Sequence, residues 1–324
     1  MRLPFCTDVS CRKNCCGNDP YDKDTNMAGI AGEGCPILVP EGGKKPLADI
    51  EKSIVKTFKK TIWTNFTRAI QDYNLIEEGD RIAVAVSGGK DSLLMAKLFQ
   101  EIKRHRKMNF ELEFIAMDPG YHPQIRELLV ENCGHLGIPI QIYESKIFKV
   151  IDDRAQDYPC YLCAKMRRGS LYNRAQELGC NKLALGHHFN DVIETTMLNV
   201  LYAGNFKTML PKLKSVNFDN MELIRPMFYI KEDAILEFTE FCGIAPLNCA
   251  CMVAAKKTGS KRREIKAMIK ELMKSYDRVD HSIFMAASNV NLDAIIGWQK
   301  DGAHHSYLEQ YGAFREDEHS DISG

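Results

Sequence analysis

Residues 81–95, RIAVAVSGGKDSLLM, decide the fold of this chain. After Arg81 the stretch begins with a short apolar run without charge, which is typical of a strand buried on both faces. The turn SGGKDS and the helix-like run LLMAKLFQEI follow. A strand, a glycine-rich turn and a helix in this order present free backbone N–H groups and the positive end of the helix dipole to an anion. The stretch therefore predicts a pyrophosphate-binding loop.

The side chains of this loop suit a phosphate ligand. The glycines let the backbone approach oxygen atoms closely, the serine hydroxyls donate hydrogen bonds, and the lysine adds positive charge. These residues are Ser87, Gly88, Gly89, Lys90 and Ser92. The spacing matches neither the Walker A pattern nor the dinucleotide pattern GxGxxG. An ordinary turn with Asp91 in the first turn of the helix is the alternative, and the buried strand before the loop favours phosphate binding.

Strand-like and helix-like segments alternate along the rest of the main region. Apolar residues spaced three or four apart from Ile50 to Ile70 predict helix before the loop. The other expected strands are 112–117, 138–143, 182–186 and 222–226, and the other expected helices are 123–135, 164–178, 190–203 and 231–242. This alternation predicts an α/β fold with a doubly wound, Rossmann-like parallel sheet.

Composition divides the chain into three parts. Residues 1–45 hold five cysteines and no sustained periodicity, so we expect a Cys-rich N-terminal extension made of loops. Residues 46–245 carry the alternating pattern and form the expected α/β domain. Residues 246–324 form a basic helical C-terminal region, clearest in GSKRREIKAMIKELMKSY.

Overall charge and hydropathy exclude several protein classes. The 324 residues include 43 basic and 43 acidic side chains, so the chain is neither a histone-like polycation nor a strongly acidic tail protein, and nucleic acid could contact only a local patch. The first residues lack the apolar core of a signal peptide, and no run of apolar residues is long enough for a membrane span. We therefore expect a cytoplasmic chain that does not contact membranes. In that reducing compartment, its twelve cysteines are interpreted as metal or redox sites before disulfides.

Two close cysteine pairs in the main part of the chain could bind a metal. Cys160 and Cys163 form a CxxC pair at a predicted helix start, where the helix dipole and the following basic residues favour thiolates. Cys249 and Cys251 form the second pair. The pairs could hold zinc or an iron–sulfur cluster, the CxxC pair could act as a dithiol, and reduced thiols without metal are the alternative.

The remaining cysteines are interpreted differently. Cys133, Cys180 and Cys242 occur singly in helical context and are predicted to be small core residues. The cysteines of the N-terminal extension match no trusted metal motif; they are Cys6, Cys11, Cys15, Cys16 and Cys35.

Taken together, these motifs resemble the PP-loop ATP pyrophosphatase superfamily, in particular the tRNA 2-thiocytidine synthetase (TtcA-like) family. The resemblance runs in order through DYNLIEEGDRIAVAVSGGKDSLLM, CYLCAKMRRGSLY, LALGHHFNDVIETTMLN, LIRPM and SKRREIKAMIKEL, and it covers about residues 60–310. It implies an ATP-dependent tRNA sulfurtransferase. Such an enzyme transfers AMP to a carbonyl oxygen of a tRNA base, releases pyrophosphate, and lets a sulfur nucleophile displace AMP.

The resemblance also implies site residues, position by position. Those expected to bind ATP and Mg²⁺ are Val86, Ser87, Gly88, Gly89, Lys90, Asp91, Ser92, Met117, Asp118, Gly186, His187 and Asp191. Cys160 and Cys163, with one distant cysteine, would hold a [4Fe-4S] cluster whose open iron binds sulfide. Cys249 and Cys251 are both candidates for that third ligand, and Cys251 is preferred. Asp91, Cys160 and Cys163 are the expected catalytic residues.

Basic side chains predict where a tRNA partner binds. The candidates are Arg167, Arg168, Lys261, Arg262 and Arg263, although a merely solvated helix face is the alternative. A sulfur donor, either a cysteine desulfurase system or sulfide, is a further expected partner, and family analogy makes a homodimer plausible. Two other functions stay open. One is a PP-loop enzyme that uses a nitrogen nucleophile, like the lysidine-forming relatives, and the other is a non-catalytic protein that binds metal and nucleotide.

Overall fold

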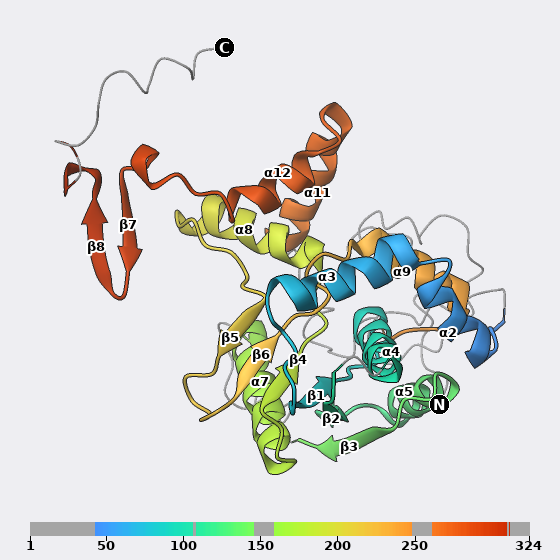
Figure 1. Ribbon diagram of the computed structural model, residues 1–324. Helices are drawn as coiled ribbons and strands as arrows, with labels where there is room; N and C mark the ends of the chain where they lie inside the picture. Colours follow the sequence, from blue (N-terminus) through green and yellow to red (C-terminus); the bar gives the residue numbers. More distant parts are fainter. Residues whose placement is uncertain (1–42, 106–107, 146–158, 248–260, 310, 312–324) are drawn as a thin grey trace, which may run out of the picture.

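The computed structural model describes residues 43–105, 108–145, 159–247, 261–309 and 311, with only the backbone of 159–164. Six strands form the central sheet in the order β3-β2-β1-β4-β6-β5 (Figure 1). Their bounds are β1 Arg81–Ala85, β2 Glu111–Asp118, β3 Ile140–Glu144, β4 Lys182–Ala184, β5 Lys212–Lys214 and β6 Glu222–Ile224. All neighbouring strands are parallel except β5, which pairs antiparallel with β6 at one edge.

Helices precede, connect and follow these strands. Their bounds are α2 Leu47–Val55, α3 Thr64–Asp72, α4 Lys90–Arg104, α5 Pro123–His135, α7 Pro159–Glu177, α8 Phe189–Ala203, α9 Glu232–Cys242, α11 Lys261–Ser275 and α12 Val279–Ala286. A π-helical turn, Lys59–Trp63, joins α2 to α3 and interrupts the helix expected from Ile50 to Ile70. Short 3-10 turns, Leu292–Ala294 and Tyr307–Glu309, flank a hairpin of β7 (Gly297–Lys300) and β8 (Ala303–Ser306).

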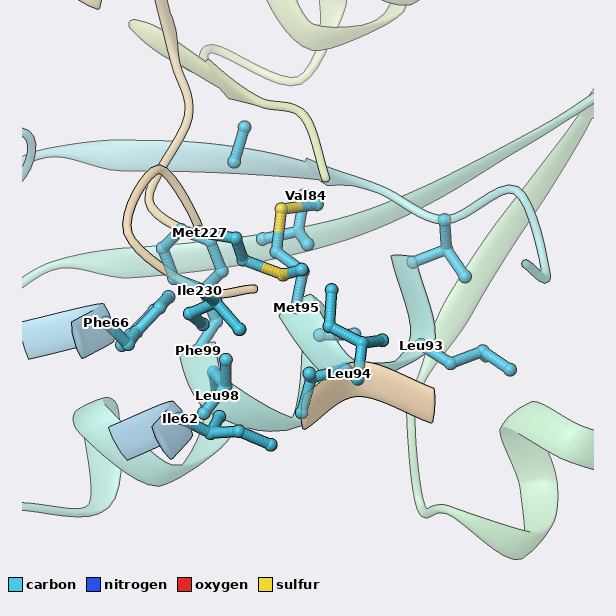
Figure 2. Packing of buried hydrophobic residues seen from close by; sticks show 14 of the residues in the cluster. Ile62, Phe66, Val84, Leu93, Leu94, Met95, Leu98, Phe99, Met227 and Ile230 are labelled. Carbon is cyan, nitrogen blue, oxygen red and sulfur yellow. The ribbon is translucent and has the colours of Figure 1, made fainter. Parts of the chain in front are cut away.

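Side chains of the parallel strands alternate between two apolar clusters, which confirms the predicted doubly wound α/β fold. Ile82 and Val84 belong to the large cluster that α3 and α4 cover, whereas Ala83 belongs to the second cluster with Tyr172 of α7. Figure 2 shows the large cluster, in which Phe66 of α3 and Phe99 of α4 lie close together. Their rings meet edge to face with centroids 5.7 Å apart. The central strand β1 therefore buries both of its faces, as the uncharged run after Arg81 predicts.

Three single cysteines are core residues, as predicted. Cys133, Cys180 and Cys242 are buried with free thiols. Burial raises the pKa of Cys133 and of Cys242 to about 12, and burial also raises that of Cys180 to about 11. These thiols are protonated at neutral pH and are poor metal ligands.

The C-terminal part of the described chain packs on α8. Ile265 and Ile269 of α11 share an apolar cluster with Phe189 and Ile193 of α8, and the Phe284 ring of α12 stacks on Phe189 at 4.8 Å. The β7–β8 hairpin stands apart from the central sheet (Figure 1). Among the described helices, none is long and apolar enough to cross a membrane.

Candidate active site

A cavity of about 340 Å³ opens at the carboxyl ends of β1, β2 and β4. Its lining residues are Ala85, Val86, Ser87, Asp91, Ser92, Met117, Tyr121, Arg167, Leu171, Leu185, Gly186, His187 and Asp191. The chain runs from β1 outward to β2 and β3, and then returns to the other side of β1 as β4. The cavity thus lies where the strand order reverses, which is the usual ligand position in open α/β sheets.

The SGGKDS loop is folded back onto the first turn of α4. The Ser92 hydroxyl accepts a hydrogen bond from the Ser87 backbone N–H at 3.1 Å and donates one to the Gly89 carbonyl at 3.0 Å. Gly89 is the residue before the helix and has extended backbone angles. This arrangement leaves backbone N–H groups of the helix start available beside the cavity, as an anion site requires.

Two glycines allow the close packing around this loop. Gly88 has φ +83°, and a Cβ atom there would lie 2.6 Å from a Leu247 methyl carbon. A Cβ atom on Gly186 would lie 3.3 Å from the backbone of Asp91 and of Ser92. Gly186 therefore lets the segment after β4 approach the loop. Gly88 and Gly89 are not among the lining residues, so their contribution is the shape of the loop.

Lys90 is turned toward carboxylates beside the cavity. Its Nζ lies 3.1 Å from Asp91 Oδ1 and 3.3 Å from Glu232 Oε1, and Lys266 Nζ lies 2.7 Å from Glu232 Oε2. Burial alone would raise the pKa of Glu232, but Lys90 and Lys266 hold it at about 2. Sequence reasoning missed Glu232 because it is separated from the loop by more than 140 positions.

Two aspartates on the cavity wall are held near one histidine. His188 Nε2 lies 3.7 Å from Asp91 Oδ1 and 3.5 Å from Asp191 Oδ2, and the His188 backbone N–H donates to Asp191 Oδ2 at 3.0 Å. Carboxylate oxygens are the ligands that Mg²⁺ prefers. Asp91 and Asp191 could therefore supply oxygen ligands to Mg²⁺.

His187 lines the cavity as a neutral imidazole. Burial lowers the pKa of His187 to about 4. The positive charges of Arg225, Arg262 and Arg168 also lower this pKa, whereas the Asp191 carboxylate raises it. Its Nδ1 atom is buried without a hydrogen-bond partner among the described residues. An orphaned buried nitrogen on a cavity wall fits a site that is completed by a ligand.

Arg262 joins the C-terminal helix α11 to this site. Its Nη2 lies 2.8 Å from Asp191 Oδ1, and its Nε lies 2.7 Å from Glu194 Oε2. Burial raises the Asp191 pKa, but His188 and Arg262 outweigh it and lower the value. The sequence predicted Arg262 as a tRNA contact, and the structure places it in ion pairs within the protein.

The other basic candidates are distributed between the cavity and the surface. Arg167 lines the cavity and Arg168 is exposed beside it. Lys261 lies on α11 with its Nζ 4.3 Å from the Tyr202 ring centroid, and Arg263 is partly buried on the same helix. Only the first two are thus brought to the candidate site.

Asp118 acts through the turn that follows β2. Its Oδ1 accepts hydrogen bonds from the backbone N–H of Gly120 at 2.9 Å and of Tyr121 at 2.7 Å. Met117 and Tyr121 line the cavity, whereas Asp118 does not. Sequence reasoning missed Tyr121, and the signal for it was an aspartate followed by a Pro-Gly turn.

The predicted cluster ligands are only partly described. The backbone of Cys160 and Cys163 lies in the first turn of α7, the helix that brings Arg167 and Leu171 to the cavity. Cys249 and Cys251 fall outside the described residues, as do the five N-terminal cysteines. In the parts of the chain that the structure describes, no group of three His, Cys, Asp or Glu side chains is arranged to hold a metal.

Comparison with known proteins identifies the family. The model of the PP-loop domain matches residues 58–245 of this chain. This chain belongs to the PP-loop family. Within that family it is 36% identical over 237 residues to the tRNA-cytidine(32) 2-sulfurtransferase of Pelobacter propionicus, covering 72% of this chain and 87% of the relative. The enzyme of the same name from Aeromonas salmonicida is 36% identical over 233 residues, covering 70% and 74%.

A solved structure shares the fold. The U34-tRNA thiolase NcsA from Methanococcus maripaludis, determined with its [4Fe-4S] cluster, aligns with a TM-score of 0.57 and 23% sequence identity. The alignment covers 75% of this chain and 84% of that structure. The resemblance stated from the motifs, a PP-loop protein of the tRNA 2-thiocytidine synthetase family, is confirmed.

Proposed function

We propose that this chain is an ATP-dependent tRNA sulfurtransferase that converts a cytidine of tRNA to 2-thiocytidine. The observation that carries the proposal is that one cavity is lined by residues from three separate motifs. The chain that contains these motifs is 36% identical to a tRNA-cytidine(32) 2-sulfurtransferase. These motifs are the SGGKDS loop, the segment after β2 and the segment after β4. By the name of these relatives, the target is the cytidine at position 32.

The reaction needs the base oxygen to become a leaving group. The O2 atom of cytidine attacks the α-phosphorus of ATP, and pyrophosphate departs. A sulfur nucleophile then bonds to C2, and AMP carries the oxygen away. The chain lowers the barrier by stabilising charge on the departing phosphates.

Each residue expected to bind ATP and Mg²⁺ has a place in this proposal. Ser87 and Ser92, with the N–H groups of the loop that Gly88, Gly89 and Lys90 shape, would hold the pyrophosphate. Asp91 and Asp191 would hold Mg²⁺. The remaining residues, Val86, Met117, Gly186 and His187, would contact the nucleoside, and Asp118 would position Tyr121 beside it.

Sulfur handling is assigned to cysteines. Thiolates are the usual ligands of iron–sulfur clusters. We assign Cys160, Cys163 and either Cys251 or Cys249 to a [4Fe-4S] cluster, which when bound would supply an iron site for sulfide. The start of α7 beside the cavity supports this assignment, since a sulfur source must lie close to the activated base.

The remaining parts of the proposal concern partners. We expect tRNA to contact Arg167, Arg168, Lys261, Arg262 and Arg263, and Arg262 also pairs with Asp191. A cysteine desulfurase system or sulfide supplies the sulfur. Family analogy supports a homodimer and a cytoplasmic location.

The test measures the product directly. The protein is reconstituted with iron and sulfide without oxygen, incubated with ATP and unmodified tRNA, and the digested tRNA is analysed by mass spectrometry. We expect 2-thiocytidine together with AMP and pyrophosphate. Cys160→Ala should abolish thiolation, whereas Cys180→Ala, a buried cysteine of the core, should retain it. Full turnover by Cys160→Ala, or a folded, reconstituted wild-type protein without thiolation, would refute the proposal.

A further inference from the structure

One buried arginine near the site forms no ion pair with a carboxylate of the described residues. Arg225 follows β6 directly and is only 4% exposed. Its Nη1 donates to the Leu210 carbonyl, while its Nε is buried without any hydrogen-bond partner. None of the carboxylates in the described part of the chain forms an ion pair with it. A buried charge without a counter-charge is costly, so its presence indicates a ligand that supplies one.

Arg225 lies beside a second guanidinium. Strand alternation puts it on the same side of the sheet as Leu223, which packs with Tyr172 of α7. Burial lowers the pKa of Arg225 to about 10, and the charge of Arg168 acts in the same direction. Arg168 lies one helical turn before Tyr172 on α7, so the helix face that packs on Leu223 also carries a second guanidinium group toward the carboxyl end of β6. Such a pair suits an oxyanion, because guanidinium groups bind phosphate through planar forks of N–H donors.

The position of Arg225 across the sheet decides whether its ligand is a phosphate of ATP or a phosphate of tRNA. Met117 lies near the end of β2 and Tyr121 follows that strand, the phosphate loop follows β1, His187 follows β4, and Arg225 follows β6. Neighbouring strands are spaced about 4.8 Å apart, so the ends of β1 and β6 lie about 10 Å apart with β4 between them. The nucleotide cavity is lined by residues at the ends of β2, β1 and β4, and Arg225, one strand further along the sheet, is not among its lining residues. Arg225 therefore lies on the side that is left for the second substrate.

We propose that Arg225, together with Arg168, binds a phosphodiester group of the tRNA strand next to the target cytidine. The inference rests on the proposed function and adds an anion subsite that is distinct from the phosphate loop. Phosphate contacts fix the register of a nucleic acid without reading its sequence. Arg225 is accordingly a positioning residue that sets how far the cytidine enters the cavity.

The test uses the full chain and follows tRNA affinity as salt is raised from 50 to 200 mM. Loss of one phosphate contact in a single-stranded segment should reduce the steepness of log affinity against log salt by about 0.7. Between 50 and 200 mM salt, the variant should therefore lose about threefold less tRNA affinity than the wild type loses. We expect this reduction for Arg225→Gln and not for Arg225→Lys, which keeps the charge. Arg81→Gln is the matched control, because Arg81 pairs with Glu113 at the opposite end of β1.

Nucleotide affinity separates the two possible sources of phosphate. ATP should bind Arg225→Gln and the wild type with the same Kd, because the proposed phosphate belongs to tRNA. A folded Arg225→Gln variant with an unchanged salt slope, or one that loses ATP affinity more than fivefold, overturns the inference. If the wild-type protein thiolates tRNA but these slopes agree, only the inference fails. If the wild type binds no tRNA, the proposed function fails with it.

Discussion

Replacing Gly88 by alanine tests the geometry of the phosphate loop most directly. Gly88 has φ +83°, a backbone conformation that costs an L-residue about 1–2 kcal/mol. An added Cβ would also lie 2.6 Å from a Leu247 methyl carbon and 2.9 Å from one of Leu129. Such overpacking costs about 1–3 kcal/mol, and because both contacts are ends of side chains we expect the lower part of this range.

Gly79 provides the matched control. Its φ is +82°, and a Cβ there would meet nothing within 4 Å. Gly79→Ala should therefore lower the free energy of unfolding by the conformational cost alone, about 1–2 kcal/mol. Gly88→Ala should lower it by about 2–4 kcal/mol, the sum of the conformational cost and the lower part of the overpacking cost. The effect of the substitution on the unfolded chain is common to the two variants and cancels in the comparison.

Urea unfolding of the two variants measures this difference, and isothermal titration of ATP measures its consequence for the site. The Gly88 carbonyl accepts a hydrogen bond from the Leu247 N–H at 2.9 Å, so relief of the clash must move the loop or its support. We expect weaker ATP binding for Gly88→Ala and wild-type binding for Gly79→Ala. Equal unfolding midpoints for the two variants, or an unchanged ATP Kd for Gly88→Ala, would refute the reasoning.

Further predictions concern the segment after β4 and the charges around it. Gly186→Ala should weaken ATP binding in titration calorimetry at a stability cost of about 1 kcal/mol, because its Cβ meets the loop backbone at 3.3 Å; unchanged affinity would contradict this. His187 has a folded pKa of about 4, below its ordinary 6.5, so it contributes stability that is present above pH 6.5 and is lost as pH falls toward 4. His187→Gln should make the urea unfolding midpoint depend less on pH between pH 6.5 and 4. The same pH dependence in this variant and in the wild type would contradict the prediction. Glu232, with its pKa lowered from 4.5 to about 2, contributes stability that is lost as pH falls below 4.5, and Glu232→Gln should flatten the profile only there. Arg262→Gln leaves a buried carboxylate of Glu194 unpaired and should cost about 1–3 kcal/mol at pH 7 in urea unfolding; no loss would show that the pair is not stabilising.

The sequence predicted the parallel core of the fold well because its strands are local apolar runs. The uncharged run after Arg81 can be buried on both faces only in a covered parallel sheet. Strand β5, Lys212–Lys214, was not predicted, because three residues with two lysines carry no apolar pattern and pair only because β6 is beside them. The β7–β8 hairpin was missed for the same reason.

The candidate site was predictable where its residues are contiguous in sequence. The SGGKDS loop carries its own signal in two glycines and two serines before a helix. Glu232 carries no local signal, since an isolated charged residue is most often a solvated one, and the LIRPM motif around Arg225 does not by itself give that arginine a role. Their importance follows from burial next to groups that are distant in sequence.

The amino-acid sequence by itself determined the chemistry available to this protein: a phosphate loop between a buried strand and a helix, and a CxxC pair at a helix start. Only the tertiary structure decided which groups share one cavity. It paired Arg262 with Asp191, lowered the pKa of His187 by burial, and left Arg225 buried without an ion pair to a described carboxylate. The physical reason is that charge state and ligand preference depend on burial and on neighbouring charges, and both arise only when distant segments pack together.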